Sequence, residues 1–269
     1  MRKMRVKLLS IVSSFRTDGN TSRAALLVEE LLHKEAALRK VDLEIERIPL
    51  GRLDVRTCRG CRLCFDKGED MCPLKDDLLS IRDRMLKADG YLFLSPVYVE
   101  DVNGILKNWI DRMAFTCHRP SLAGKCAYLI TTSGAGSTGH ALRTMDAALH
   151  TWGCRVAGRI KLRTGALMDK EEMRAKHGKI IRRAAETFLN GLMRGADTDP
   201  GFYSLIAFRV QQICWDKPEY QATNPYDYQY WKGKSWLERG CTYYLPLKKS
   251  RLKVALARFM GNGIAKFFV

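Results

Sequence analysis

The sequence predicts an α/β fold in which five parallel strands are joined by helices that cover both faces of one sheet. Two observations predict it. Short apolar runs alternate with longer segments that carry apolar residues at helical spacing, and this alternation continues through the first 195 residues without an internal repeat. Strands joined by helical crossovers form a three-layer, doubly wound sheet, whose ligands bind beyond the carboxyl ends of the strands.

The elements follow from the local pattern in chain order. The first strand is expected where the apolar run RVKLLSIVS ends in small polar residues. The first helix is expected where Leu26, Leu27, Leu31 and Leu32 follow each other at helical spacing. The same two patterns then repeat. The expected strands are 5–13, 43–48, 91–94, 126–131 and 156–162, and the expected helices are 21–40, 76–87, 105–114, 139–151 and 171–193. Loops that follow strands are therefore the candidate sites.

The pattern changes after residue 195, so we divide the chain into a domain at 1–195 and a C-terminal extension at 196–269. The extension opens with an aromatic-rich segment that we expect to form an ordered cover, because so many aromatic rings would not stay exposed. Its Trp and Tyr residues include Trp215, Tyr220, Tyr226, Tyr228, Tyr230, Trp231, Trp236, Tyr243 and Tyr244.

The chain ends in a basic amphipathic tail. Residues 245–269 hold six Lys or Arg residues and no acid, interleaved with Leu252, Leu256, Phe259, Ile264 and Phe267. Such a tail lies on an anionic membrane surface, packs on a partner subunit, or docks as a terminal helix whose lysines face solvent. The pattern leaves these three interpretations open.

Composition limits the classes of function. The net charge of +17 suits anionic partners, but acidic residues are mixed among the basic ones and no zinc-finger, RNP or recognition-helix signature appears. We therefore do not expect nucleic-acid binding. No apolar run reaches the roughly 18 residues of a membrane-spanning helix, and the MRK start leads into a strand rather than a signal peptide, so we expect a cytoplasmic protein.

The loop after the first strand has the composition of a phosphate cradle. Hydroxyls, a glycine, an arginine and the N–H groups of a helix N-terminus together solvate a phosphate dianion. The alternative is an ordinary N-cap, because Ser, Thr and Asn are preferred capping residues. The candidate phosphate ligands are Ser14, Arg16, Gly19, Asn20, Thr21 and Ser22.

The Ser-x-Arg-x-x-Gly-Asn-Thr spacing of residues 14–21 resembles the phosphate loop of the NAD(P)H-dependent FMN reductase family, a flavodoxin-like group that includes the iron-sulfur flavoproteins. The resemblance extends over roughly residues 5–195. It implies a flavodoxin-like fold, non-covalently bound FMN, and electron transfer from NAD(P)H to a small-molecule or protein acceptor. It also implies a homodimer or larger homo-oligomer, because the family completes its flavin pocket across subunits.

Two further loops carry the resemblance. Residues 95–98 (SPVY), followed by GILK at 104–107 and by Asp111-Arg112, look like the segment that packs beside the flavin ring, and residues 131–136 (TTSGAG) look like the second ring-contacting loop. Flat apolar side chains and backbone N–H groups suit the ring and its polar edge. The alternative for both is a simple turn. The candidate ring contacts are Pro96, Val97, Tyr98, Ser133, Gly134 and Gly136.

Four cysteines form the most distinctive motif, CRGCRLC followed seven residues later by CP. Three thiolates at three-residue intervals and a fourth from a short loop can close a tetrahedral set around a metal centre, and the neighbouring arginines favour the thiolate form. The spacing resembles that of the iron-sulfur flavoproteins, which implies a 4Fe-4S cluster. Free or redox-active thiols and zinc remain alternatives. The candidate ligands are Cys58, Cys61, Cys64 and Cys72.

Other chemistry-bearing residues are assigned structural roles. Cys117, Cys126, Cys154, Cys214 and Cys241 lack ligand spacing and are expected as small buried hydrophobes. Asp111 and Arg112 are interpreted as a surface or helix-packing ion pair. The five histidines show no metal or triad spacing, so none is a candidate.

The leading hypothesis is an FMN-dependent oxidoreductase that accepts a hydride, with NAD(P)H as the expected donor. Two alternatives remain. One is an iron-sulfur flavoprotein that carries electrons without meeting nicotinamide directly. The other is a non-enzymatic binding module that keeps the scaffold and recruits a membrane or a protein partner through its tail.

Overall fold

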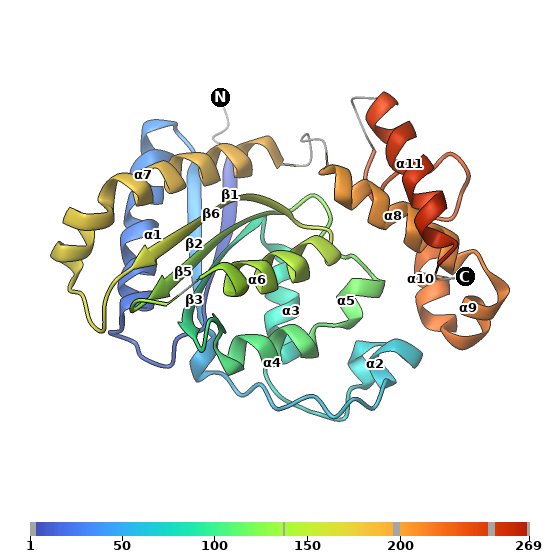
Figure 1. Ribbon diagram of the computed structural model, residues 1–269, viewed down its shortest axis with the longest axis horizontal. Coiled ribbons are helices and arrows are strands. Elements are labelled where there is room, and N and C mark those ends of the chain that lie inside the picture. The colour runs from blue at the N-terminus through green and yellow to red at the C-terminus, as the bar shows by residue number, and fades with distance from the viewer. Residues whose placement is uncertain (1–3, 137, 196–199, 247–250, 268–269) are drawn as a thin grey trace.

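A five-stranded parallel sheet forms the centre of the molecule, as predicted (Figure 1). The computed structural model describes residues 4–136, 138–195, 200–246 and 251–267. Along the sheet the strands lie in the order β2, β1, β3, β5, β6, which is the flavodoxin-like order, so the switch point lies between β1 and β3. Their bounds are β1 (Arg5–Val12), β2 (Asp42–Pro49), β3 (Gly90–Tyr98), β5 (Cys126–Ser133) and β6 (Arg155–Arg163).

Helices cover both faces of this sheet and give two separate core layers. On one face, α1 (Asn20–Leu38) and α7 (Lys170–Arg194) pack against the strands around Leu8, Ile130 and Phe188. On the other face, α3 (Leu78–Lys87), α4 (Gly104–Arg112) and α6 (Gly139–Thr151) pack around Tyr91 and Trp109. The three-layer architecture is therefore confirmed.

Strand β3 runs further than the sequence indicates, to Tyr98 instead of Leu94. Pro96 does not end the ladder, because Pro96 still pairs with Thr132 of β5, and the strand then turns back to the short antiparallel β4 (Asp101–Val102). The two residues of the turn, Val99 and Glu100, have φ values of 48° and 66°. Left-handed backbone in a β-branched residue is strained, so this hairpin is held by its surroundings.

The cysteine segment has little regular structure. Between β2 and α3 the chain forms only the 3-10 turns η1 (Leu50–Arg52) and η2 (Glu69–Met71) and the single-turn helix α2 (Leu63–Asp66). Helix α3 begins two residues later than predicted, since the Asp76 carboxylate accepts the Leu78 N–H at 3.1 Å instead of entering the helix. Side chains from other elements therefore have to fix this segment.

The C-terminal extension is helical and has its own apolar core. It contains α8 (Phe202–Trp215), α9 (Pro218–Thr223), α10 (Pro225–Gly233) and α11 (Arg251–Ala265), and it lies beside the sheet domain next to α2 and the single-turn α5 (Phe115–His118) (Figure 1). Most of the aromatic residues expected in the cover are buried together. The fully or mostly buried ones are Trp215, Trp231, Trp236, Tyr243 and Tyr244.

Helix α11 docks on α8, but its exposed face is apolar instead of being lined with lysines. Leu252 and Phe259 are 82% and 77% exposed, whereas Ala257 and Gly261 are buried. Leu247, Lys248, Lys249, Phe268 and Val269 of the expected tail lie outside the described residues. Within the described ranges, the structure contains no helix that is both long and apolar enough to cross a membrane.

Candidate functional site

A groove of about 200 Å³ lies at the carboxyl ends of β1, β3, β5 and β6, where the strand order predicts a ligand site. It brings together ten of the twelve residues predicted for FMN. The remaining two, Ser22 and Gly136, do not line it but each bonds to a residue that does. The groove is lined by Ser14, Arg16, Gly19, Asn20, Thr21, Pro96, Val97, Tyr98, Thr132, Ser133, Gly134, Thr164, Gly165, Ala166 and Leu167.

The loop after β1 curls around its own carbonyl groups and leaves the N-terminus of α1 without a side-chain cap. Ser14 Oγ accepts the Arg16 N–H at 3.1 Å, and Ser22 Oγ donates to the Arg16 carbonyl at 2.7 Å. The N-cap residue is Gly19, and no side chain caps the helix there. The ordinary N-cap interpretation is therefore wrong. The hydroxyls shape the loop, and the uncapped start of α1, which is the positive end of the helix dipole, lines the groove with Gly19, Asn20 and Thr21.

Asn20 and Thr21 connect this loop to distant strands. Asn20 Nδ2 donates to Thr164 Oγ1 at 2.8 Å, and Asn20 Oδ1 accepts the Met168 N–H at 2.8 Å. Thr21 Oγ1 lies 2.7 Å from Thr132 Oγ1. The Asn20 amide is thus committed to the loop after β6, so its side chain shapes the groove from within the protein.

The two loops that are expected to contact a flavin ring also lie at the groove. Tyr98 is 50% exposed at the end of β3, next to the strained Val99–Glu100 turn. On the opposite wall, Ser133 Oγ donates to the Gly136 carbonyl at 3.0 Å, which holds the Gly-rich turn against the end of β5. The wall at the end of β5 therefore offers backbone groups and small side chains, and the wall at the end of β3 offers flat apolar side chains.

Sequence reasoning missed one part of the groove lining and one buried residue that supports it. The loop after β6, residues 164–167, lines it, and the rule that every post-strand loop reaches this edge could have identified it. Asn103 is fully buried, and its Nδ2 donates to the Ser13 carbonyl at 2.7 Å, which ties the start of α4 to the phosphate loop. No local pattern marked Asn103.

All four motif cysteines line a second cavity, of about 100 Å³. Cys58 and Cys61 are exposed, and Cys64 and Cys72 are half-buried. In the part of the chain that the structure describes, no three His, Cys, Asp or Glu side chains are arranged closely enough to hold a metal ion. The four thiols therefore share one cavity without forming a closed metal centre, and their number and type match what a 4Fe-4S cluster needs.

A buried ion pair supports this cavity from α4. Arg112 Nη1 lies 2.6 Å from Asp76 Oδ2, with both side chains almost fully buried, and Arg112 Nη2 lies 3.7 Å from Cys72 Sγ. Asp111 instead pairs with Lys107 at the surface. Asp111 and Arg112 were expected to pair with each other at the surface or in helix packing, but each pairs with a different residue. Neighbouring residues on a helix point in different directions.

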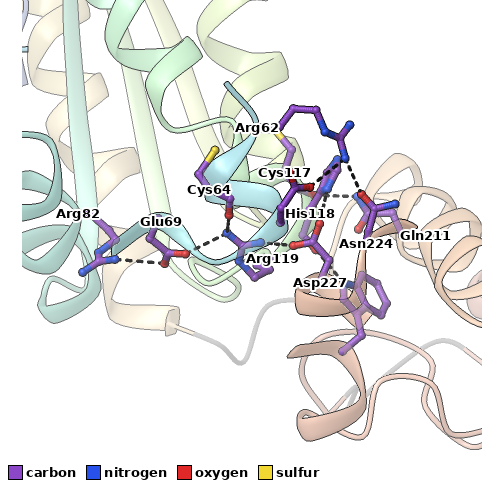
Figure 2. Close-up of polar contacts among 12 residues, drawn as sticks. Arg62, Cys64, Glu69, Arg82, Cys117, His118, Arg119, Gln211, Asn224 and Asp227 are labelled. Carbon is purple, nitrogen blue, oxygen red and sulfur yellow. Dashed lines mark hydrogen bonds and ion pairs between the residues drawn. The ribbon is translucent and has the colours of Figure 1, made fainter. Parts of the chain in front are cut away.

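Arg119 holds the other side of the cavity (Figure 2). Its guanidinium, 3% exposed, donates to the Cys64 carbonyl at 2.7 Å and to Glu69 Oε2 at 2.9 Å, and it pairs with Asp227 of α10. The Asp227 side chain is fully buried. One arginine therefore joins the cysteine segment to the C-terminal extension.

Neighbouring contacts extend the same junction (Figure 2). His118 Nδ1 lies 2.6 Å from Asp227 Oδ2, and Trp231 Nε1 donates to the His118 carbonyl at 2.7 Å. The Tyr226 ring covers Gly68 so closely that a Cβ there would lie 2.6 Å from it. His118 has a structural role here, and neither it nor Asp227 belongs to a motif that sequence reasoning could use.

Burial controls the ionisation of the cysteines. Desolvation raises the pKa of the Cys64 thiol, and the Arg119 charge only partly offsets this effect. Cys126 and Cys154 are buried as expected, and burial raises the pKa of Cys126 to about 11. Cys117, Cys214 and Cys241 are half-buried, and burial raises the pKa of each. These five thiols therefore stay protonated near neutral pH.

Comparison with known proteins adds a family match. Residues 6–164 match the family model described as NADPH-dependent FMN reductase. This range includes the loops after β1, β3 and β5 that line the groove and all four motif cysteines, and it covers more than half of the chain.

Curated relatives are similar over most or part of the chain. An iron-sulfur flavoprotein of Archaeoglobus fulgidus is 27% identical over 240 residues, which cover 86% of this chain and all of the relative. An iron-sulfur flavoprotein of Methanocaldococcus jannaschii is 37% identical over 107 residues, which cover 40% of this chain and 51% of the relative. An iron-sulfur flavoprotein of Clostridioides difficile is 28% identical over 176 residues, which cover 64% of this chain and 75% of the relative.

Solved structures support the fold. An oxidoreductase from Corynebacterium diphtheriae has a TM-score of 0.54 at 20% identity, covering 72% of this chain and 99% of its own. RosB, solved with bound 8-demethyl-8-formylriboflavin-5'-phosphate, has a TM-score of 0.53 at 15% identity. The match covers 70% of this chain and 80% of RosB. At these identities the likeness extends to the α/β fold alone.

Proposed function

This chain belongs to the NADPH-dependent FMN reductase family of flavin-dependent oxidoreductases, and we propose that it binds FMN non-covalently to carry electrons from NAD(P)H to a small-molecule or protein acceptor. One observation carries the assignment of the FMN site. Helix α1 begins uncapped at the groove, beside Ser14 and Arg16, at the strand ends where this fold binds ligands.

The phosphate end of the groove suits a dianion. The first-turn N–H groups of α1 and the exposed Arg16 side chain would donate charge-assisted hydrogen bonds to phosphate oxygens. Gly51 packs under this loop so closely that a Cβ would lie 2.6 Å from the Ser14 carbonyl oxygen. The loop is therefore preorganised, and binding does not have to order it.

The other end suits the ring. Pro96, Val97 and Tyr98 would hold a flat aromatic system on one side, and Ser133 and Gly134 would offer backbone groups to its polar edge. When bound, FMN supplies a hydride acceptor and a donor of one or two electrons. The half-exposed Tyr98 and the strained turn after it leave this end of the groove open to a donor.

The cysteine cavity supports a second redox centre. We assign Cys58, Cys61, Cys64 and Cys72 as ligands of a 4Fe-4S cluster, because four thiols surround one cavity and relatives named iron-sulfur flavoproteins match this chain. Arg112 lies beside Cys72, and its positive charge would offset part of the negative charge of a cluster bound by four thiolates. Cys58 and Cys61 are exposed on a segment with little regular structure, so their side chains can turn toward the cavity.

That cavity also favours a second candidate function, an electron carrier that exchanges electrons through the cluster and never meets nicotinamide. One measurement distinguishes the two functions. Anaerobic addition of NADPH to the FMN-loaded protein bleaches the flavin absorbance within seconds if the chain is a reductase. A carrier stays oxidised with NADPH and is reduced only by a low-potential protein or chemical donor.

The exposed apolar face of α11 supports a symmetric homodimer as the assembled state. Light scattering of the FMN-loaded protein at micromolar concentration tests this, and twice the chain mass is expected. A monomeric mass together with flotation on anionic vesicles assigns the same face to a membrane surface instead.

The FMN site is tested by titrating apoprotein with FMN and following flavin fluorescence. Arg16→Ala removes a charge-assisted hydrogen bond and should weaken binding about tenfold or more. Arg183→Ala removes an exposed charge from α7, far along the chain from the groove, and should leave the affinity within about twofold. Equal affinities of wild type and Arg16→Ala would remove the phosphate assignment.

A further inference from the structure

A third cavity, of about 600 Å³, lies in the C-terminal extension and is lined by residues of α8, the start of α9, the loop after α10, and α11. The helices α8 and α11 lie side by side (Figure 1). The cavity shares no lining residue with the flavin groove or the cysteine cavity. The residues that line it are Arg209, Gln212, Ile213, Asp216, Lys217, Pro218, Leu237, Arg239 and Arg258.

The charge of this cavity is strongly unbalanced. Three arginines and Lys217 line it, and the carboxylate of Asp216 is the single acidic group among the lining residues. In the described ranges, none of the four cations is within ion-pair distance of a carboxylate. The buried arginines elsewhere behave differently, since Arg112 and Arg119 both face carboxylates.

Two of the arginines are held in place by neutral oxygens. Arg209 Nε donates to Asn262 Oδ1 and Arg209 Nη1 donates to Gln212 Oε1, both at 2.7 Å. Arg258 Nη1 donates to the Cys241 carbonyl at 3.2 Å. Gly261 of α11 packs on the Arg209 stem so closely that a Cβ would lie 2.8 Å from it. The guanidinium groups are therefore positioned without being neutralised.

Positive charges held close together without carboxylate partners destabilise the folded protein. Arg209 and Arg258 are half-buried like charges. Burial together with the Arg258 charge lowers the pKa of Arg209, and the nearby Asp216 charge offsets this only in part. Gln212, which is almost fully buried, donates to the Trp236 carbonyl at 2.7 Å and so fixes the loop that carries Arg239. Hydrogen bonds thus hold the mutually repelling cations in fixed positions, and an anion bound in the cavity would reduce the repulsion between them.

We propose that this cavity binds a small molecule that carries a pyrophosphate group. Four cations against one carboxylate suit an anion of several charges, whereas a single carboxylate would leave most of them unpaired. Planar guanidinium forks match phosphate oxygens in pairs. Ile213, Pro218 and Leu237 line the apolar part of the wall, where the organic portion of the ligand packs.

Calorimetric titration of FMN-loaded protein with inorganic pyrophosphate tests the site, because FMN keeps the probe out of the phosphate loop. Arg258→Gln should weaken pyrophosphate about tenfold, and Arg239→Gln, at an exposed position with little risk to folding, about threefold or more. Arg251→Gln makes the same charge change on α11 outside the cavity and should stay within about twofold of wild type.

Three outcomes overturn the proposal. One is the absence of pyrophosphate binding to folded, FMN-loaded wild type at millimolar concentration. Another is an equal loss of affinity in Arg239→Gln and Arg251→Gln, which reduces the effect to net charge. The third is binding of anionic vesicles or duplex DNA that competes with pyrophosphate and is unaffected by Arg258→Gln and Arg239→Gln, which assigns the charges to a general polyanion surface.

Discussion

The groove that we propose for FMN and the cysteine cavity are built by different physical means. Loops that follow four parallel strands make the groove, and neutral hydrogen bonds such as Asn20 to Thr164 and Thr21 to Thr132 fix them. The cysteine cavity lies in a segment with little regular structure, and buried charges fix it, with Arg112 on α4 at one side and Arg119 with Asp227 at the other.

This difference shows which part of the molecule stabilises each site. The groove depends on the sheet alone, because every element that lines it is part of the sheet domain. The cavity depends on the C-terminal extension, because Asp227 and Tyr226 contact the residues that hold Cys64 and Gly68. A change in the extension should therefore damage the cysteine cavity and spare FMN binding.

The largest effect is expected from Asp227→Asn. This substitution removes one of the two carboxylates that pair with the buried Arg119, and Glu69 remains as the other. Loss of one member of a buried ion pair destabilises by about 3–5 kcal/mol, and with Glu69 retained we expect about 3 kcal/mol. Urea unfolding followed by tryptophan fluorescence measures it, since Trp231 and Trp236 lie in the same part of the extension. FMN affinity should stay within about twofold of wild type.

Asp83→Asn is the matched control for this prediction. The Asp83 side chain is 52% exposed, and its partner Arg82 keeps Glu69 and Asp70 as carboxylate partners. Loss of the Asp83 charge should therefore change the free energy of unfolding by less than about 1 kcal/mol. If Asp227→Asn weakens FMN as strongly as it destabilises the extension, the two regions are not independent and the comparison fails.

A smaller effect separates backbone strain from packing. Gly68 has φ +96° and would place a Cβ 2.6 Å from the Tyr226 ring, whereas Gly60 has φ +63° and open space around it. Gly60→Ala should destabilise by about 1–2 kcal/mol through its left-handed backbone. Gly68→Ala should destabilise by at least about 2–3 kcal/mol, because it adds displacement of Tyr226 to the backbone strain.

Chemical unfolding of both glycine variants measures the difference between them. Limited proteolysis adds a structural readout, since release of Tyr226 should expose α10 in Gly68→Ala alone. Identical stability and identical cleavage of the two variants would mean that the extension does not press on the cysteine segment.

The smallest expected change is the pH dependence of stability that Asp76 contributes on the other side of the cavity. Asp76→Asn itself breaks a buried ion pair with Arg112 and lowers stability at neutral pH. Burial alone would raise the pKa of Asp76, but hydrogen bonds from Arg112 and from the N–H groups of Arg56 and Leu78 outweigh it and lower that pKa. A carboxyl group with a lowered pKa adds stability above its unfolded value, near pH 4, and loses it as the pH falls through the folded pKa.

The stability difference between wild type and Asp76→Asn should thus be constant from about pH 7 to pH 5 and shrink below about pH 4. Urea unfolding of both proteins across this range measures it, and comparing differences removes the titration of other groups. A difference that stays constant down to about pH 3 would show that Asp76 is not ionised in its pair with Arg112.

The sequence predicted the groove well because strand order places consecutive post-strand loops at one edge, so local motifs were sufficient. It could not show that the Asn20 amide is committed to Thr164, 144 residues away. It also could not connect Arg119 with Asp227, 108 residues apart, because neither lies in a motif. Long-range partners of single polar residues depend on the tertiary fold, and periodicity and spacing carry no information about them.

The fold itself was predictable for the same reason. Apolar periodicity marked all five parallel strands and the five helices between and after them, and most of their ends lie within about two residues of those observed. The exception is β3, where Pro96 suggested an end but the ladder to β5 and the hairpin to β4 continue to Tyr98. Tertiary pairing there overrides the local signal.

The most direct test of the account is the flavin, iron and sulfide content of anaerobically prepared, iron-reconstituted protein, measured for wild type, Cys61→Ala, Cys64→Ala and the control Cys214→Ala. We predict about one FMN per chain in all four, and about four iron and four sulfide in wild type and Cys214→Ala, with most of the iron lost in the other two. Less than about one iron per wild-type chain, or unchanged iron in Cys61→Ala and Cys64→Ala, would contradict the assignment of the cysteine cavity as a cluster site.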